Sequence, residues 1–332
     1  MNRGVFAYLG GRFFQSLLVL FFVVTLLFLL FRLAPGNPLV AYIDPTFTEE
    51  QQDELLRRFG LDKPLSIQYL IYLGNLLQGD MGDSFFQRKP ATEIIFQVLP
   101  NTLYLTLTAL FVAYVIGVIG GIILAWRRGS RMEQTGVTFT LMTRAAPDFW
   151  VGMILLAIFA FNLGWFPSSG ASSAGTIYES EWDKLTSLDF WWHMVLPATT
   201  LAIYLHGLPL LLMRSNMLEV LQGDFITMGR LMGYSEWRVM VRHAARNALL
   251  PVVTAMALGI GYSIGGNVVI ENVFGWPGLG RVLVRAVSVN DYPLAQAAFL
   301  AIAIVMIAMN FFADIMYGVL DPRVGSSERA KT

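Results

Sequence analysis

The chain has 332 residues, of which 55% are hydrophobic and 14% charged, and its mean hydropathy is +0.57. This composition is too apolar for a soluble domain and indicates a polytopic membrane protein. A formal net charge of zero gives no support to a nucleic-acid partner, and the absence of cysteine excludes disulfides and thiolate metal sites.

The predicted fold is all-α, with six transmembrane helices recognised as apolar runs of about 20 residues, enough to cross roughly 30 Å of hydrocarbon. The first run is expected to be a retained helix, because it is too long for a signal peptide and no small-residue cleavage site follows it. Pro147 should bend or break the third, because it lacks an amide donor and its ring clashes with the preceding turn. The six runs are 11–31, 102–126, 136–165, 192–213, 248–270 and 294–317.

These runs divide the chain into four parts. Residues 1–32 hold an N-terminal segment and the first helix, and 33–101 form a region between helices with short amphipathic helices of its own. Residues 102–325 form a five-helix core that includes the loop 214–247, and 326–332 form a tail.

The region 33–101 is too long to be a simple connection. A helix is predicted after Thr48, with acidic residues in its first turn and Arg57 and Arg58 in its last, before Gly60 ends it. A second, amphipathic helix is predicted in SIQYLIYLGNLLQG, residues 66–79. The region could be a cap lying on the membrane surface or a docking surface for an external partner.

Basic residues predict the orientation, since Lys and Arg concentrate in short cytoplasmic loops. The two short loops on the other side carry only Lys184, Arg281 and Arg285. Both termini and the loop 214–247 are therefore expected in the cytoplasm. The segments on that side carry Arg3, Arg12, Arg127, Arg128, Arg131, Arg214, Arg230, Arg238, Arg242, Arg246, Arg323, Arg329 and Lys331.

The loop 214–247 predicts two short helices joined by a glycine. Asp224 is expected to cap a helix that ends at Gly233, and Ser235 to cap a second helix. Arg238, Arg242 and Arg246 recur every four residues and should share a face of the second helix. Lipid anchoring would explain the charges but not the glycine joint.

The chain resembles the permease subunits of bacterial ATP-binding-cassette importers, in the oligopeptide, dipeptide and nickel branch. Gly233 and Leu250-Pro251 match that family's loop signature, although its Glu-Ala-Ala positions hold Thr227, Met228 and Gly229 here. The other matching motifs keep the family's order: LAPGNP at 33–38, GLDKPLSIQY at 60–69, LPNTLYLT at 99–106, PDFWVG at 147–152, LGWFPSSG at 163–170, and ENVFGWPGLGRVLV through YGVLDPR at 271–323.

The resemblance implies a type I importer permease in the bacterial inner membrane, paired with a second homologous permease. Two cytosolic ATPase subunits would dock below it and an external substrate-binding protein above. The loop would then be the coupling helix that contacts an ATPase, through Asp224, Gly229, Arg230, Gly233, Ser235, Arg238 and Arg242. The chain has no phosphate-binding loop of its own, so ATP and Mg²⁺ are expected on the ATPase partners, and no cofactor on this chain.

Candidate residues for the substrate path are ionisable groups inside the spans, where charge is costly away from protein or water. Arg144 and Asp148 flank Pro147; they could pair with each other, line the path, or lie near the cytosolic interface. His206 is a packing or a cavity residue. Asp314 is expected to pair with a basic loop residue.

Other functions find little support in the residues. No catalytic constellation can be assembled, and the three histidines are too dispersed to predict a metal site. A self-contained secondary transporter or channel would explain the spans, but no inverted repeat is visible. Peptides, nickel chelates, opines, glycosides and glutathione-like compounds all remain open as substrates.

Overall fold

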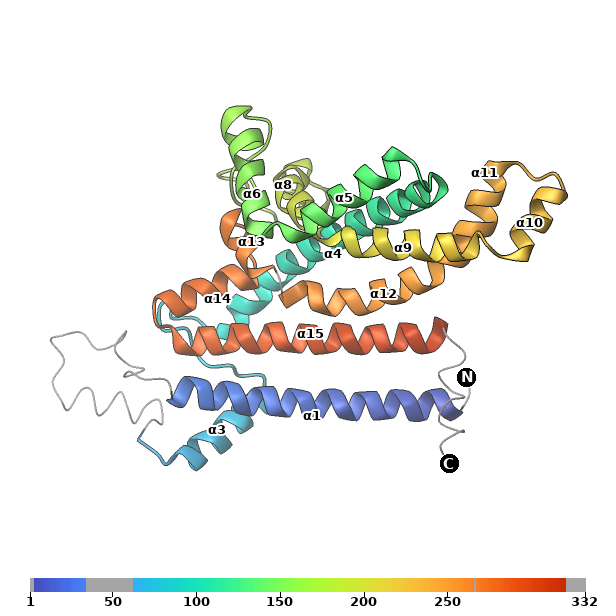
Figure 1. The fold of residues 1–332 in the computed structure, drawn as a ribbon. Helices are drawn as coiled ribbons and strands as arrows, with labels where there is room; N and C mark the ends of the chain where they lie inside the picture. Colours follow the sequence, from blue (N-terminus) through green and yellow to red (C-terminus); the bar gives the residue numbers. More distant parts are fainter. Residues whose placement is uncertain (1–2, 34–61, 266, 321–332) are drawn as a thin grey trace.

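The computed structural model describes residues 3–33, 62–265 and 267–320, which fold into helices joined by turns (Figure 1). In this part of the chain no β-strand forms beyond an isolated bridge between Asp83 and Pro90. The helices are α1 (Arg3–Leu33), α3 (Leu65–Leu77), α4 (Ala91–Trp126), α5 (Arg131–Ala145), α6 (Asp148–Leu155), the π-helix η1 (Leu156–Asn162), α7 (Glu181–Thr186), α8 (Leu188–Leu205), α9 (Gly207–Val220), α10 (Asp224–Leu231), α11 (Glu236–Arg238), the π-helix η2 (Val239–Ala245), α12 (Arg246–Gly265), α13 (Val268–Val273), α14 (Leu279–Ser288) and α15 (Tyr292–Leu320).

Three to five of the six predicted spans are supported by length and composition. Leu9–Leu33, Ala91–Trp126 and Tyr292–Ile315 are each long and apolar enough to cross a membrane. Two bent pairs, α5 with α6–η1 and α8 with α9, bring the number to five if each pair is one span. The predicted span 248–270 coincides with α12, but several of its side chains lie outside the described residues.

Helices from the two ends of the chain lie side by side. In Figure 1, α1 runs along α15, and α3 lies beneath α1. Tyr69 of α3 hydrogen bonds to Thr25 at 2.6 Å, and Phe28 packs against the rings of Tyr69 and Tyr72. The second helix predicted between the first two spans is therefore confirmed, and the helix predicted after Thr48 lies outside the described residues.

Asp314 of α15 has the basic partner that the sequence predicted, but from a different element. The Nε of Arg12 lies 3.6 Å from its carboxylate, and Arg12 belongs to α1 rather than to a loop. The ion pair therefore joins the first and last helices near one end.

α4 begins eleven residues earlier than the predicted span 102–126, at Ala91, and includes Pro100. Its first turns carry the exposed polar residues Glu93 and Gln97, which explains why hydropathy alone placed the start too late. Farther along, Gly117 and Gly121 face α9 so closely that an added Cβ would lie 2.8 Å from the carbonyl oxygen of His206 and 2.6 Å from that of Leu210. The backbones of α4 and α9 are thus in direct contact.

Two breaks interrupt the central helices. The predicted break at Pro147 is confirmed: the axes of α5 and α6–η1 meet at 101°, and Pro147 precedes the first residue of α6. Ala146, the residue before proline, takes an extended conformation, as its steric restriction requires. A second bend, of 42°, separates α8 from α9 at His206 and was not predicted.

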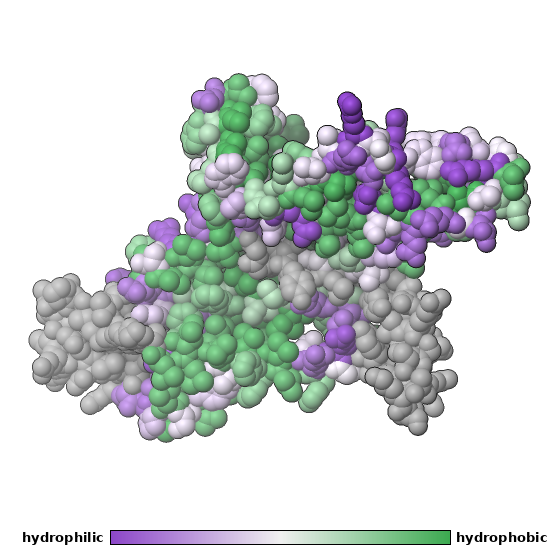
Figure 2. Space-filling view, viewed as in Figure 1, coloured by the Kyte–Doolittle hydropathy of each residue, from purple (hydrophilic) through white to green (hydrophobic). Residues whose placement is uncertain are grey.

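The turns alternate between two ends of the molecule. Figure 1 shows α10, α11, the α4–α5 turn, the start of α1 and the end of α15 at one end, and α3 and α14 at the other. Hydrophilic side chains gather over the end with α10 and α11, and hydrophobic ones cover much of the remaining face (Figure 2). This arrangement agrees with the three to five candidate spans.

Candidate functional site

The loop predicted to couple with a partner forms α10 and α11, joined at Gly233, and we call residues 224–238 the docking end. Gly233 has φ +78°, a conformation that favours glycine, and the amide of Tyr234 returns to the carbonyl of Gly229 at 3.1 Å. One detail is corrected, because Gly223 occupies the cap of α10 and Asp224 is its first residue. Ser235 does cap α11, but its side chain makes no capping hydrogen bond.

The inner face of the docking end is fixed to the helical core. Ile226 of α10 and Val239 of η2 are fully buried and join one hydrophobic cluster with Met213 and Met217 of α9. Gly229 is also buried, and a Cβ there would lie in ordinary van der Waals contact with the ring of Tyr234. A displacement of α10 would therefore be transmitted to α9.

Two arginines hold the elbow together. Arg230 donates from Nε and Nη2 to the two carboxylate oxygens of Glu236, at 3.1 and 3.3 Å, and lies over the ring of Trp126. Arg238 lies over the ring of Tyr234, which stacks on His243. Both guanidinium groups thus help to set the angle between α10 and α11.

The predicted arginine face is exposed, but its helix is not a regular α-helix. Arg238, Arg242 and Arg246 are all exposed, while η2 between the first and last of them is a wider π-helix. The exposure of all three side chains agrees with the predicted basic face.

The docking end also exposes large hydrophobic side chains, which sequence reasoning missed. Leu231 is 80% exposed and Trp237 71% exposed, at an end where hydrophilic residues prevail. Large hydrophobic side chains exposed at a polar end make this end a candidate interaction site. The hydrophobic positions in LQGDFITMGRLMGYSEW are the signal that could have revealed it: Phe225, Met228, Leu231, Met232 and Trp237.

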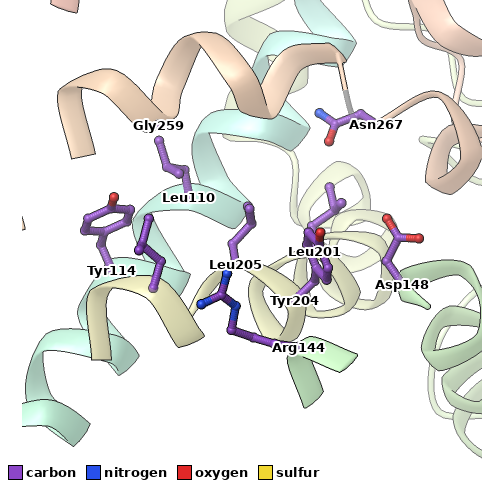
Figure 3. Close-up of a pocket in the computed structure, with 10 residues that line it drawn as sticks. Leu110, Tyr114, Arg144, Asp148, Leu201, Tyr204, Leu205, Gly259 and Asn267 are labelled. Atoms are coloured by element: carbon purple, nitrogen blue, oxygen red, sulfur yellow. The ribbon is translucent and has the colours of Figure 1, made fainter. Parts of the chain in front are cut away.

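A second candidate site is a cavity of about 360 Å³ between α4, the α5–α6 break, the α8–α9 bend and α12 (Figure 3). Its wall is mainly apolar, with Arg144 and Asp148 as its charged members. The lining residues are Leu110, Tyr114, Arg144, Asp148, Leu201, Tyr204, Leu205, Leu208, Gly259 and Asn267.

The two charged residues do not pair, contrary to one of the alternatives from sequence. The described part of the chain places no carboxylate within 4.0 Å of the Arg144 guanidinium, and Arg144 and Asp148 lie apart in Figure 3. Asp148 accepts a 2.7 Å hydrogen bond from the amide of Phe149 at the start of α6.

The position of Arg144 depends on Gly207, whose lack of a side chain leaves room for it. A Cβ on Gly207 would lie 2.3 Å from Cδ of Arg144, so the aliphatic stem of Arg144 rests on the backbone at the α8–α9 bend. His206, beside it, is buried, its Nδ1 lies 2.6 Å from the carbonyl oxygen of Ile203, and it is not among the residues that line the cavity. That position favours the packing alternative for His206.

The end opposite α10 contains a buried carboxylate that sequence reasoning assigned no role. Glu271 of α13 is fully buried and accepts hydrogen bonds from Thr102 Oγ1 at 2.6 Å, Gly280 N at 2.7 Å and Arg281 N at 3.1 Å. Burial raises the pKa of Glu271 to about 7, although each of these hydrogen bonds favours the charged form. We call these four residues the Glu271 cluster; it joins α4, α13 and α14.

Comparisons with known proteins agree with this architecture. The profile of the family described as "Binding-protein-dependent transport system inner membrane component" matches residues 117–326, and that of its N-terminal component matches 5–106. The chain is 38% identical to the oligopeptide transport system permease protein AppB of Bacillus subtilis, over 96% of this chain and 99% of that one. It is 40% identical to the di/tripeptide transport system permease protein DppB of Pseudomonas aeruginosa, over 92% and 94%.

Another relative and a solved structure extend the comparison. The glutathione transport system permease protein GsiC of Salmonella typhi is 35% identical, over 92% of this chain and 94% of its own. An inward-facing structure of the MetNI methionine ABC transporter shares the fold with a TM-score of 0.55 at 15% identity, covering 69% of this chain and 96% of that chain.

These matches favour a permease subunit of a binding-protein-dependent importer over a self-contained secondary transporter or channel, and a transport component over an enzyme. They also place the chain in the bacterial inner membrane. The chain belongs to the family of inner membrane permease components of binding-protein-dependent ABC importers.

Proposed function

We propose that this permease pairs with a second homologous permease and carries peptides or similarly small polar solutes into the cell. In this proposal both termini and the docking end face the cytoplasm, in line with the excess of basic residues on that side. Two ATPase subunits bind ATP and Mg²⁺ and dock below the pair, and a substrate-binding protein delivers cargo from outside. Relatives named for oligopeptide, di/tripeptide and glutathione transport support this class of substrate.

The observation that carries the ATPase contact is the construction of the docking end. Its inner face is anchored by Ile226 and by the adjoining Val239 of η2, its angle is set at Gly233, and its outer face exposes Leu231 and Trp237. A surface that is packed against the core on one side and exposes apolar side chains on the other can bind a partner and transmit its movement to the core. Motion of an ATPase would reach α9 through the buried contacts of α10.

The region between the first two spans is proposed to contact the substrate-binding protein. Its described part is held from two sides: α3 packs on α1 through Tyr69 and Tyr72, and Asp291 fixes the segment before α4. The carboxylate of Asp291 accepts hydrogen bonds from Ser84 Oγ at 2.5 Å and from the amides of Phe85 and Phe86 at 3.0 and 3.1 Å. These ties would hold the region in place while a partner binds.

Site-directed crosslinking tests the ATPase contact. The chain contains no cysteine, so single cysteines can be introduced at Leu231 or Trp237 without background. Both should crosslink to an ATPase subunit in the assembled importer, because both side chains are exposed on the docking end. Arg127, in the α4–α5 turn at the same end, is the matched control.

The outcomes separate clearly. Crosslinks to the ATPase from positions 231 and 237, with little from 127, would support the proposal. Capture from 127 but not from the other two would show that the ATPase docks elsewhere. If the permease purifies without any bound ATPase subunit, the proposed assembly with two ATPase subunits is wrong.

A further inference from the structure

The cavity of Figure 3 carries one cationic and one anionic side chain that do not neutralise each other. Arg144 comes from the last turn of α5 and Asp148 from the first turn of α6, on the two sides of the break at Pro147. A continuous α-helix would place residues four apart on one face, where an arginine and an aspartate pair readily. The 101° bend separates them instead, and both line the same cavity.

Both charged groups keep hydrogen-bonding capacity for a ligand. In the part of the chain that the structure describes, Arg144 has neither an ion pair nor a hydrogen-bond partner, so all of its guanidinium donors are available. Asp148 uses one carboxylate oxygen for the amide of Phe149, and its second oxygen remains. An arginine facing a carboxylate forms strong, charge-assisted and often bidentate hydrogen bonds.

The rest of the wall suits a small molecule with an apolar middle. Leu110, Leu201, Leu205 and Leu208 supply hydrophobic surface. A volume of about 360 Å³ falls in the range of roughly 300–1,000 Å³ that is usual for small-molecule sites. A zwitterion of dipeptide size has the complementary arrangement: an ammonium at one end, a carboxylate at the other, and side chains between.

We infer that this cavity is a transit site for zwitterionic cargo, in which Arg144 binds the carboxylate and Asp148 the ammonium group. The inference rests on the proposed importer function and adds the chemistry by which the permease itself recognises cargo. Gly207 contributes to the site, because it lets the aliphatic stem of Arg144 lie on the α8–α9 bend. A rearrangement at that bend would therefore move the guanidinium group and change its hydrogen bonds to the cargo carboxylate.

Protection of a cysteine in the cavity wall tests the site directly, without uptake or the substrate-binding protein. Leu208→Cys introduces one thiol into the cysteine-free chain, and its maleimide labelling is followed in the assembled, detergent-solubilised importer. Four probes are compared: alanyl-alanine, its N-acetyl form, its C-terminal amide, and the doubly capped form. Alanyl-alanine should protect at concentrations at least tenfold lower than the doubly capped form.

A second substitution, added to Leu208→Cys, tests which side chain binds each end of the peptide. Arg144→Gln should abolish protection by the N-acetyl form, which keeps only the carboxylate, and leave protection by the amide unchanged. Asp148→Asn should do the reverse. Arg131→Gln, at the exposed start of the same helix α5, is the matched control and should change neither.

Several results would overturn the inference. Equal protection by charged and capped probes would reduce the cavity to an apolar site, and absence of protection by any probe would remove it as a binding site. If either variant fails to assemble, Arg144→Lys and Asp148→Glu replace them, and should retain protection with weakened affinity. Because labelling does not depend on ATP hydrolysis, its outcome is independent of whether the docking end captures an ATPase.

Discussion

At the end of the molecule formed by α13 and α14, one buried carboxylate receives three hydrogen bonds, whereas at the opposite end α10 and α11 turn on one glycine and expose large hydrophobic side chains. The Glu271 cluster is complete within the chain, since Thr102, Gly280 and Arg281 all donate to Glu271. At the docking end only the inner face is packed against the core, and Leu231 and Trp237 are 80% and 71% exposed in the part of the chain that the structure describes.

The difference shows how one helical bundle combines a tightly hydrogen-bonded joint with an exposed apolar surface. Loss of a group from the Glu271 cluster leaves buried donors without acceptors, which is costly. Loss of an exposed group from the docking end removes contacts that water can replace. Substitutions at the two ends should therefore differ strongly in their effect on stability, and the following predictions test that contrast.

Glu271→Ala should have the largest effect. It leaves the buried Thr102 hydroxyl and Gly280 amide, and the partly buried amide of Arg281, without an acceptor, at about 1–3 kcal/mol for each buried group. We expect a loss of at least about 3 kcal/mol in the free energy of unfolding, measured by denaturation of the purified protein in detergent. Glu236→Ala, in the exposed α11, is the control and should change stability by less than about 1 kcal/mol. Similar losses at both positions would refute the contrast.

Stability should fall as the pH rises because of the same carboxyl group. The pKa of Glu271 is about 7 in the folded protein against a usual 4.5, so between these values the folded chain keeps a proton that the unfolded chain has lost. The contribution is therefore fully present below pH 4.5 and lost as the pH rises through 7, by roughly 3 kcal/mol in total. Glu271→Gln should lack this slope, which unfolding measured across the pH range would reveal. Parallel profiles for the two proteins would contradict the assignment.

Replacement of a glycine should destabilise the two ends for different physical reasons. In Gly280→Ala the new Cβ would lie 2.5 Å from Cα of Val268, an overpacking that costs about 1–3 kcal/mol. Gly233→Ala meets open space but must hold φ +78°, at about 1–2 kcal/mol. Asparagine tolerates positive φ, so Gly233→Asn should destabilise less than Gly233→Ala, while Gly280→Asn should destabilise more than Gly280→Ala. The same order of Asn and Ala at both sites, in thermal unfolding, would disprove this distinction.

The Arg230–Glu236 ion pair should contribute least. Its side chains are 45% and 59% exposed, and exposed pairs contribute up to about 1 kcal/mol. A double-mutant cycle with Arg230→Ala and Glu236→Ala should give a coupling energy below about 1 kcal/mol that declines with added salt. A coupling energy as large as the loss in Glu271→Ala would show that the elbow is as rigid as the opposite joint.

The elements that follow from local sequence were predicted well. The glycine elbow at 233, the break at Pro147 and the amphipathic helix α3 each depend on a few neighbouring residues, and all three are present. The family also follows from sequence, because its motifs occur in order along the chain. The roles given to residues of the docking end remain predictions that the crosslinking experiment addresses.

What the sequence could not show depends on contacts between distant residues. The start of α4 at Ala91 was missed because Glu93 and Gln97 lower the hydropathy of its first turns, whereas Ile94 and Ile95 are buried against residues of α14 and α15 that are distant in the sequence. The bend at His206 has only Gly207 and Pro209 as a local signal. The separation of Arg144 from Asp148 requires the angle at the break, which a periodicity argument does not supply. Nothing local in the motif ENVFGWPGLG shows that Gly278 and Gly280 make room for the carboxylate of Glu271.

The glycine contact between α4 and α9 has a consequence for how the protein moves. Gly117 and Gly121 lie against backbone atoms of α9 and against Pro209 and Met213, so the two helices are closely packed at that contact. We expect the two helices to move as one body. A push on α10 would reach α9 and α4 together, and the strain would concentrate at the joints beside that body, the bend at His206 and the break at Pro147. These are the places where a change of access from one side of the membrane to the other can be accommodated.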